Sequence, residues 1–185
     1  PSPGVLLGLL SLVRAVGRPP REDLRITAGL EGRLFLRPAT PLVGPLAAVE
    51  LGPVRVEASW LVGRTRDALG DVDLALGTLA AGVRVACFQR GVASLCGSTH
   101  ARIGLARARA RPNREARGRS PLATYLGLEL VLDAWWSWTR LALRGALRGG
   151  WGHGLVATAA DREVASLGGG FLGLELGLVW GPRPP

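Results

Sequence analysis

The stretch FLGLELGLVW at residues 171–180 alternates strictly between two kinds of side chain. Side chains in a β-strand point to opposite faces in turn, so one face of this stretch is wholly apolar and the other carries glycine and a carboxylate. The apolar face consists of Leu172, Leu174, Leu176, Leu178 and Trp180. The same alternation recurs along most of the chain, with Arg, Glu and Gly opposite the apolar residues. It predicts a barrel that is apolar outside and polar within.

The alternation predicts eight strands, at residues 24–36, 42–51, 54–62, 72–87, 92–108, 122–133, 140–148 and 171–180. Tight turns are expected at Gly52-Pro53, at Gly91-Val92 and at Trp135-Trp136-Ser137. Longer loops are expected at 63–71, 109–121 and 149–167. The apolar parity changes within the fourth strand, which predicts a bulge near Gly77-Thr78.

These elements predict an all-β protein, an eight-stranded antiparallel up-and-down transmembrane β-barrel. Long and short connections alternate, which is typical of bacterial outer-membrane barrels. The expected organisation is an upstream linker or processed remnant at 1–22, the barrel at 23–181 and a short Pro-rich tail at 182–185.

Charged residues on the polar faces are expected to point into the lumen, because an arginine at the bilayer midplane costs about 2–4 kcal/mol. The predicted lumen network comprises Arg25, Glu31, Arg33, Glu50, Arg55, Glu57, Glu129, Asp133, Arg140, Arg144, Arg148 and Glu175. The predicted lipid-facing residues include Leu126, Leu128, Leu130, Leu141 and Leu143, together with the four leucines of the last strand. An eight-stranded barrel is filled by its side chains. A plugged core is therefore expected in place of a pore.

The six tryptophans fall near the predicted strand ends, which favours aromatic girdles at the two membrane interfaces. Trp135, Trp136, Trp138 and Trp180 are expected at the periplasmic rim, and Trp60 and Trp151 near the outer rim. The alternative is that they pack within a soluble core.

A formal charge of +9 is compatible with binding to nucleic acid, and all 23 basic residues are arginine. Many of these arginines alternate with leucines inside strands, however, and the Arg-rich segment has no aromatic residue to stack on bases. Nucleic-acid binding is therefore disfavoured. Lipopolysaccharide phosphates are the partner expected instead for a group of six arginines, Arg107, Arg109, Arg111, Arg114, Arg117 and Arg119.

Cys87 and Cys96 flank the predicted Gly91-Val92 turn and lie opposite each other if that turn has two residues. A disulfide is then geometrically possible, and an oxidising compartment permits it. Two unpaired small apolar residues are the alternative. No metal site is expected, because only His100 and His153 are available to complete one.

The chain resembles the small eight-stranded outer-membrane barrels represented by the OmpA membrane domain and OmpX, over about residues 24–180. The most specific element is the terminal strand, which is similar to the assembly signal of such barrels in its alternating leucines and its aromatic Trp180. The resemblance implies the outer membrane of a Gram-negative bacterium and a monomer without a cofactor. It also implies outer-membrane lipid, lipopolysaccharide and the outer-membrane assembly machinery as partners.

The leading hypothesis is a non-enzymatic barrel with a structural or surface-interaction role through its loops. One alternative is a barrel-embedded enzyme that uses His153, Asp161, Ser120 or His100, although no nucleophile and base have a telling spacing. Another is a soluble lipocalin-like barrel that binds an apolar ligand. That alternative requires the leucines inside and the arginines outside.

Overall fold

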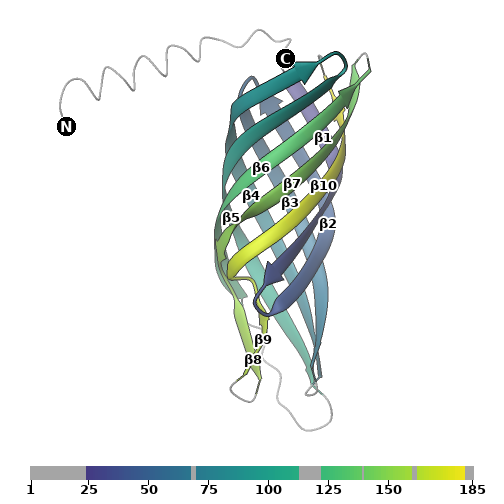
Figure 1. Ribbon diagram of the computed structural model, residues 1–185. Helices are drawn as coiled ribbons and strands as arrows, with labels where there is room; N and C mark the ends of the chain where they lie inside the picture. The colour runs from purple at the N-terminus through teal and green to yellow at the C-terminus, as the bar shows by residue number, and fades with distance from the viewer. Residues whose placement is uncertain (1–23, 68–69, 113–121, 139, 160–161, 182–185) are drawn as a thin grey trace, which may run out of the picture.

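The computed structural model describes residues 24–67, 70–112, 122–138, 140–159 and 162–181 (Figure 1). These residues form ten strands. Within the described ranges, no helix is long and apolar enough to cross a membrane.

Eight of the strands close into an antiparallel barrel in the order β1-β10-β7-β6-β5-β4-β3-β2. Their bounds are β1 Leu24–Leu36, β2 Ala39–Leu51, β3 Val54–Asp67, β4 Gly70–Arg90, β5 Ala93–Pro112, β6 Leu122–Ser137, β7 Leu141–His153 and β10 Gly169–Trp180. The remaining two, β8 Val156–Ala159 and β9 Arg162–Ser166, form a separate hairpin between β7 and β10. The predicted fold class and strand number of the barrel are confirmed.

The FLGLELGLVW segment is the strand that closes the barrel. It forms most of β10, which pairs with β7 on one side and with β1 on the other. Glu31 of β1 lies opposite Glu175 of β10, so the first and last strands of the barrel place two carboxylates side by side. A barrel closed in this way leaves no open sheet edge along its wall.

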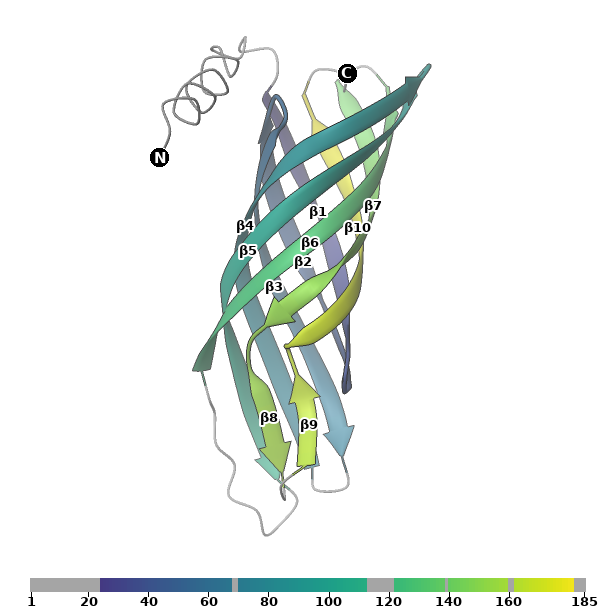
Figure 2. The ribbon, with the colours of Figure 1, turned by 60° about the vertical axis from the view of Figure 1, so that its left-hand side comes forward.

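The barrel has two distinct ends. The terminal end carries the start of β1, the finish of β10 and the short turns of β2–β3, β4–β5 and β6–β7. Gly52 and Gly91 occupy the left-handed region there, with φ of 58° and 63°, as tight two-residue turns require. The β4–β5 hairpin extends farthest at this end (Figure 2). The distal end carries the β1–β2 turn, the β3–β4 connection and the β8–β9 hairpin (Figure 1).

Most of the barrel strands are longer than predicted, so the predicted loops are shorter. The 63–71 loop is mostly strand, because β3 continues to Asp67 and β4 begins at Gly70. Likewise β5 continues to Pro112, which places Arg107 and Arg109 in a strand. The 149–167 loop contains the end of β7 and the β8–β9 hairpin. Polar and small residues concealed these strand extensions, because alternation is weak where neither face needs to be apolar.

The predicted bulge near Gly77-Thr78 is wrong. Strand β4 keeps one register with β3 and β5 through this region, and its register shift lies between Arg84 and Ala86. The apparent change of parity has another cause. Val72, Leu74 and Leu76 face the lumen, whereas Leu79 and Val83 face outward.

Candidate functional site: the lumen and the distal rim

The middle of the lumen holds a network of ion pairs, here called the ionic layer, centred on Arg148 of β7. Its guanidinium donates to Glu57 at 2.8 Å, to Glu129 at 2.7 Å and to Glu175 at 3.1 Å. These carboxylates come from β6 and β10, the two neighbours of β7 in the wall, and from β3, which is not adjacent to β7, so one side chain links both neighbouring strands to a remote one. A guanidinium has five N–H donors in a planar fork, which allows this sharing.

Two further arginines complete the ionic layer on its distal side. Arg102 of β5 donates to Glu129 at 2.9 Å and also contacts Glu57. Arg33 of β1 donates to Glu31 at 2.6 Å and to Glu129 at 3.0 Å.

Among the described residues, six buried arginines face six buried carboxylates in the lumen. The balance matters because breaking a buried pair leaves an uncompensated charge in a poorly solvated interior.

Toward the terminal end, Arg55 links the ionic layer to a second cluster. It donates to Glu50 at 2.7 Å and to Glu175 at 2.9 Å. Glu50 also accepts from Arg84 at 2.8 Å. The ring of Trp135 lies here, with the guanidinium carbons of Arg84 and Arg144 each 5.5 Å from a ring centroid. Such cation–π contacts favour a buried tryptophan over a girdle position.

All but one of the residues predicted for the lumen are buried inside the barrel. The exception is Arg140, which is exposed in the β6–β7 turn, one residue before β7 begins. Arg140 has the same alternation as Arg144 and Arg148 in the sequence, but β7 begins only at Leu141 and does not include it. Trp135 is the converse case: predicted at the rim, it is 2% exposed and faces the lumen. Residues 135–137 belong to β6, and the turn follows them.

Sequence reasoning missed three members of the lumen network: Arg84, His100 and Arg102. Arg102 and His100 share inward parity with Ser98 on β5, while Ala101 and Ile103 face outward. That two-residue period was the available signal. It was obscured because the irregular strand at 92–108 leads directly into the run of arginines at 107–111.

Toward the distal end, the lumen contents change from ionic to apolar. This apolar layer comprises Phe35, Leu42, Leu61, Val72, Leu74, Leu76, Ala106, Ala108, Tyr125, Leu155, Ala165, Leu167 and Phe171. The ring centroids of Phe35 and Phe171 are 5.6 Å apart. The guanidinium carbon of Arg33 lies 4.8 Å from the centroid of the Phe171 ring. Arg33 therefore joins the two layers.

The β8–β9 hairpin contributes to the apolar layer from the distal end. Leu155, Ala165 and Leu167, in and next to the hairpin, are buried among the wall residues. The backbone N–H of Ser166 donates to the Thr40 hydroxyl of β2 at 3.4 Å. The base of the hairpin therefore packs into the barrel mouth, while Val156, Thr158 and Glu163 are exposed.

Tyr125 fits into the apolar layer because the neighbouring wall positions are glycine. A Cβ atom at Gly152 would lie 2.6 Å from the Tyr125 hydroxyl oxygen, and one at Gly127 would lie 3.0 Å from it. Glycine is the residue that permits this close approach of ring and backbone.

Glu57, His100 and Glu129 come close enough together to be considered as a metal site, with ligand atoms within 4.8 Å of one another. Arginines already occupy these carboxylates, however. Oε1 of Glu57 and Oε1 of Glu129 each accept from both Arg102 and Arg148. A metal ion would have to displace two guanidinium groups, so the residues present do not fit a metal centre.

Of the residues considered for an embedded enzyme, the two that the structure describes, His100 and His153, do not come together. His100 is buried in the lumen, with its Nε2 3.0 Å from the Ser98 hydroxyl oxygen, whereas His153 is exposed at the end of β7. Ser120 and Asp161 lie outside the described residues. The cavity beside Ser98 and His100 has a volume of about 10 Å³. That is room for about one water molecule and not for a substrate.

The two cysteines are joined by a disulfide bond, as the hairpin geometry allowed. Cys87 and Cys96 are directly opposite each other, with Cα atoms 4.1 Å apart, and the turn between the strands is Gly91-Val92. The bond cross-links the β4–β5 hairpin where it extends at the terminal end.

The outer surface of the barrel is apolar. The leucines predicted to face lipid on β6, β7 and β10 are all exposed there. The soluble lipocalin-like arrangement requires the reverse. Trp136, Trp138 and Trp180 are exposed at the terminal end, and Phe88 of the β4–β5 hairpin is a further exposed aromatic residue there. Trp60 and Trp151 are also exposed on the outer surface.

At the distal rim, the outward face of β3, β4 and β5 becomes charged. Arg64 donates to Asp73 at 2.7 Å, and the Arg66 guanidinium lies 3.5 Å from the Asp71 carboxylate. The hydrogen bond with Asp73 raises the pKa of the Arg64 guanidinium above its usual value. Of the arginines predicted to contact lipopolysaccharide, Arg107 and Arg109 are exposed at this rim. The side chain of Arg111, and Arg114, Arg117 and Arg119, lie outside the described residues.

The sequence matches no protein-family model and no curated protein. Solved structures do match. Neisserial surface protein A superposes with a TM-score of 0.53 at 14% identity, covering 86% of this chain and 97% of that one. The N-terminal β-barrel domain of Pseudomonas aeruginosa OprF gives 0.50 at 16% identity, covering 86% and 98%. The chain therefore has the fold of the small eight-stranded outer-membrane β-barrels.

Proposed function

We propose that this protein is a non-enzymatic integral protein of a Gram-negative outer membrane, with a plugged lumen and a structural or surface-interaction role at its distal end. The supporting observation is the contrast between its two surfaces. The outside is apolar around the barrel, while the inside carries balanced charges followed by a packed apolar layer. An apolar exterior of this kind is stable in lipid and unfavourable in water.

Reconstitution tests the membrane part of the proposal. The purified chain should require detergent, have a β-rich circular dichroism spectrum and migrate differently on gels before and after heating. Fractionation of the producing bacterium should place it in the outer membrane. A helical spectrum or a freely water-soluble monomer would contradict the proposal.

Conductance tests the plugged lumen. In planar bilayers the chain should give no current steps, because buried charged and apolar side chains fill the described part of the lumen, whereas a large porin in the same bilayers gives clear steps. Reproducible steps that increase with the amount of protein would refute the plug without affecting the membrane assignment.

Two kinds of partner follow from the proposed location. The terminal strand β10, with its outward leucines and Trp180, is the segment we expect the outer-membrane assembly machinery to recognise. Trp180→Ala should therefore reduce insertion in cells more than it reduces folding in detergent; equal losses would argue against recognition. Outer-membrane lipid and lipopolysaccharide are the partners expected at the barrel surface, and a monomer is expected in detergent.

A further inference from the structure

The distal rim of β3, β4 and β5 is organised in rows that cross the three strands. Strand pairing places Trp60, Gly77 and Leu105 in one row and Val62, Ala75 and Arg107 in the next. The following row is Arg64, Asp73 and Arg109. The outward face thus changes from apolar to ionic within two rows, which is the change expected where hydrocarbon gives way to headgroups.

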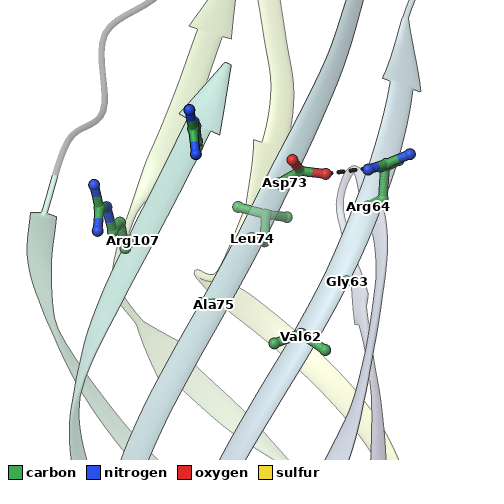
Figure 3. A pocket seen from close by; sticks show the side chains of 8 residues that line it. Val62, Gly63, Arg64, Asp73, Leu74, Ala75 and Arg107 are labelled. Carbon is green, nitrogen blue, oxygen red and sulfur yellow. Dashed lines mark hydrogen bonds and ion pairs between the residues drawn. The ribbon is translucent and has the colours of Figure 1, made fainter. Parts of the chain in front are cut away.

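A groove lies at this transition, between an ion pair and an arginine. It has a volume of about 580 Å³ and is lined by Val62, Gly63, Arg64, Asp73, Leu74, Ala75, Arg107 and Arg109. Figure 3 shows the Arg64–Asp73 pair on one side, Arg107 on the other, and Leu74 and Ala75 between them. The lining therefore combines small or apolar residues with three arginines and one carboxylate.

The charges of the groove are unequal, and the excess is positive. Asp73 is hydrogen-bonded to Arg64. Arg107 has Ala75 and Leu122 as its cross-strand neighbours, and neither is acidic. It lies two residues from Arg109 on the same exposed face of β5. Arg109 lies across from Asp73. Guanidinium forks at alternate positions of one strand face are suited to a phosphate group, which offers several acceptor oxygens.

We propose that this groove binds the phosphate of a phosphorylated membrane glycolipid, with Arg107 and Arg109 as the phosphate ligands. The acyl chains would continue along the apolar rows that contain Val62, Leu105 and Trp60. This inference rests on the proposed function, because it needs the distal rim at headgroup level. A lipid fits better than a free anion because the apolar rows continue directly from the groove.

Native mass spectrometry of the full chain in detergent tests the inference with three probes. These are bisphosphorylated lipid A, the same lipid A after removal of its phosphates, and inorganic phosphate. The wild type should retain bisphosphorylated lipid A about tenfold more tightly than the dephosphorylated form, because charge-assisted hydrogen bonds are lost with the phosphates. Inorganic phosphate should bind far more weakly, since it lacks the acyl chains.

Matched double variants locate the effect. Arg107→Ser with Arg109→Ser should abolish the discrimination between the two lipids, whereas Arg37→Ser with Arg90→Ser removes the same charge from exposed positions outside the groove and should preserve it. Replacing Arg107 and Arg109 with lysine should give an intermediate value, because charge is kept and the fork is lost.

Equal binding of the two lipids, or unchanged discrimination in the Arg107/Arg109 serine variant, would overturn the inference. Inorganic phosphate bound as tightly as lipid A would instead assign the groove to a free anion, which also overturns it. Gel migration before and after heating is measured on the same samples. Loss of that shift in the wild type contradicts the proposed function itself, whereas a retained shift without lipid discrimination rejects only this inference.

Discussion

The ionic layer and the apolar layer fill the same lumen by opposite means. Around Arg148, stability depends on each charge having a partner, and the pair with Glu57 joins strands far apart in the chain. Around Phe35 and Leu76, it depends on shape, with rings and leucines in direct contact. The ionic layer tolerates little loss of charge, whereas the apolar layer tolerates little loss of volume.

This difference also separates what each layer contributes. The ion pairs select one register, because a slip by one residue would turn Arg144 and Arg148 toward lipid. The apolar layer receives part of its packing from the β8–β9 hairpin, through Leu155 and Leu167. The first layer therefore specifies the wall, and the second attaches the distal hairpin to it.

The largest effect is expected from Arg148→Ala. The substitution leaves Glu57, Glu129 and Glu175 with fewer partners in the lumen, and breaking such a buried pair costs about 3–5 kcal/mol. Urea unfolding in lipid vesicles measures the loss. Arg140→Ala is the matched control, since Arg140 is exposed in a turn, and it should stay within about 0.5 kcal/mol of the wild type. Similar losses of unfolding free energy in the two variants would contradict a stabilising role for the ionic layer.

Leu76→Ala tests the apolar layer. Leu76 is fully buried, so its truncation leaves a cavity and should cost about 2–5 kcal/mol. Leu79→Ala removes the same atoms from the outer face of the same strand, where lipid chains fill the space, and should cost less. The free energy of unfolding of both variants decides the point. An equal or larger loss at Leu79 would show that the distal lumen is not tightly packed.

Leu174→Arg tests the contrast between lumen and exterior. Leu174 is exposed outward near the middle of β10, and an arginine at the bilayer midplane costs about 2–4 kcal/mol. Leu141→Arg, at the terminal end of β7, places the same charge near the interface and should cost about 0–1 kcal/mol. Unfolding from vesicles and the yield of inserted protein provide the measurement. No dependence on depth would contradict a membrane-facing exterior.

The smallest effect is expected from replacing Cys87 and Cys96 together with serine. The disulfide closes a short hairpin loop, so its loss should lower the free energy of unfolding by about 2 kcal/mol. Unfolding of the wild type with and without reductant should reproduce the difference. A reductant effect that persists in the double-serine variant would show that the measurement does not report on this bond.

Alternation identified the wall of this protein well, because a strand with lipid on one side and charges on the other has little freedom in composition. It was misleading at Val72, Leu74 and Leu76, where the inward face is itself apolar, and a bulge was predicted in place of a change in the lumen. It was also misleading at Trp135, because a tryptophan near a strand end can lie either at the membrane interface or in the lumen against arginine side chains. Arg140 shows the same limit, since the alternation in the sequence extends beyond β7, which begins only at Leu141.

The sequence by itself determined the eight-stranded barrel, which side of each strand is apolar, and most of the charges that line the lumen. These follow from a local, two-residue period and from the cost of placing charge in lipid. Only the tertiary structure decided which arginine pairs with which carboxylate, that the lumen becomes apolar toward the distal end, and that Arg64, Asp73 and Arg107 border one groove. Each of these depends on the register between strands distant in the chain, which a local pattern does not encode.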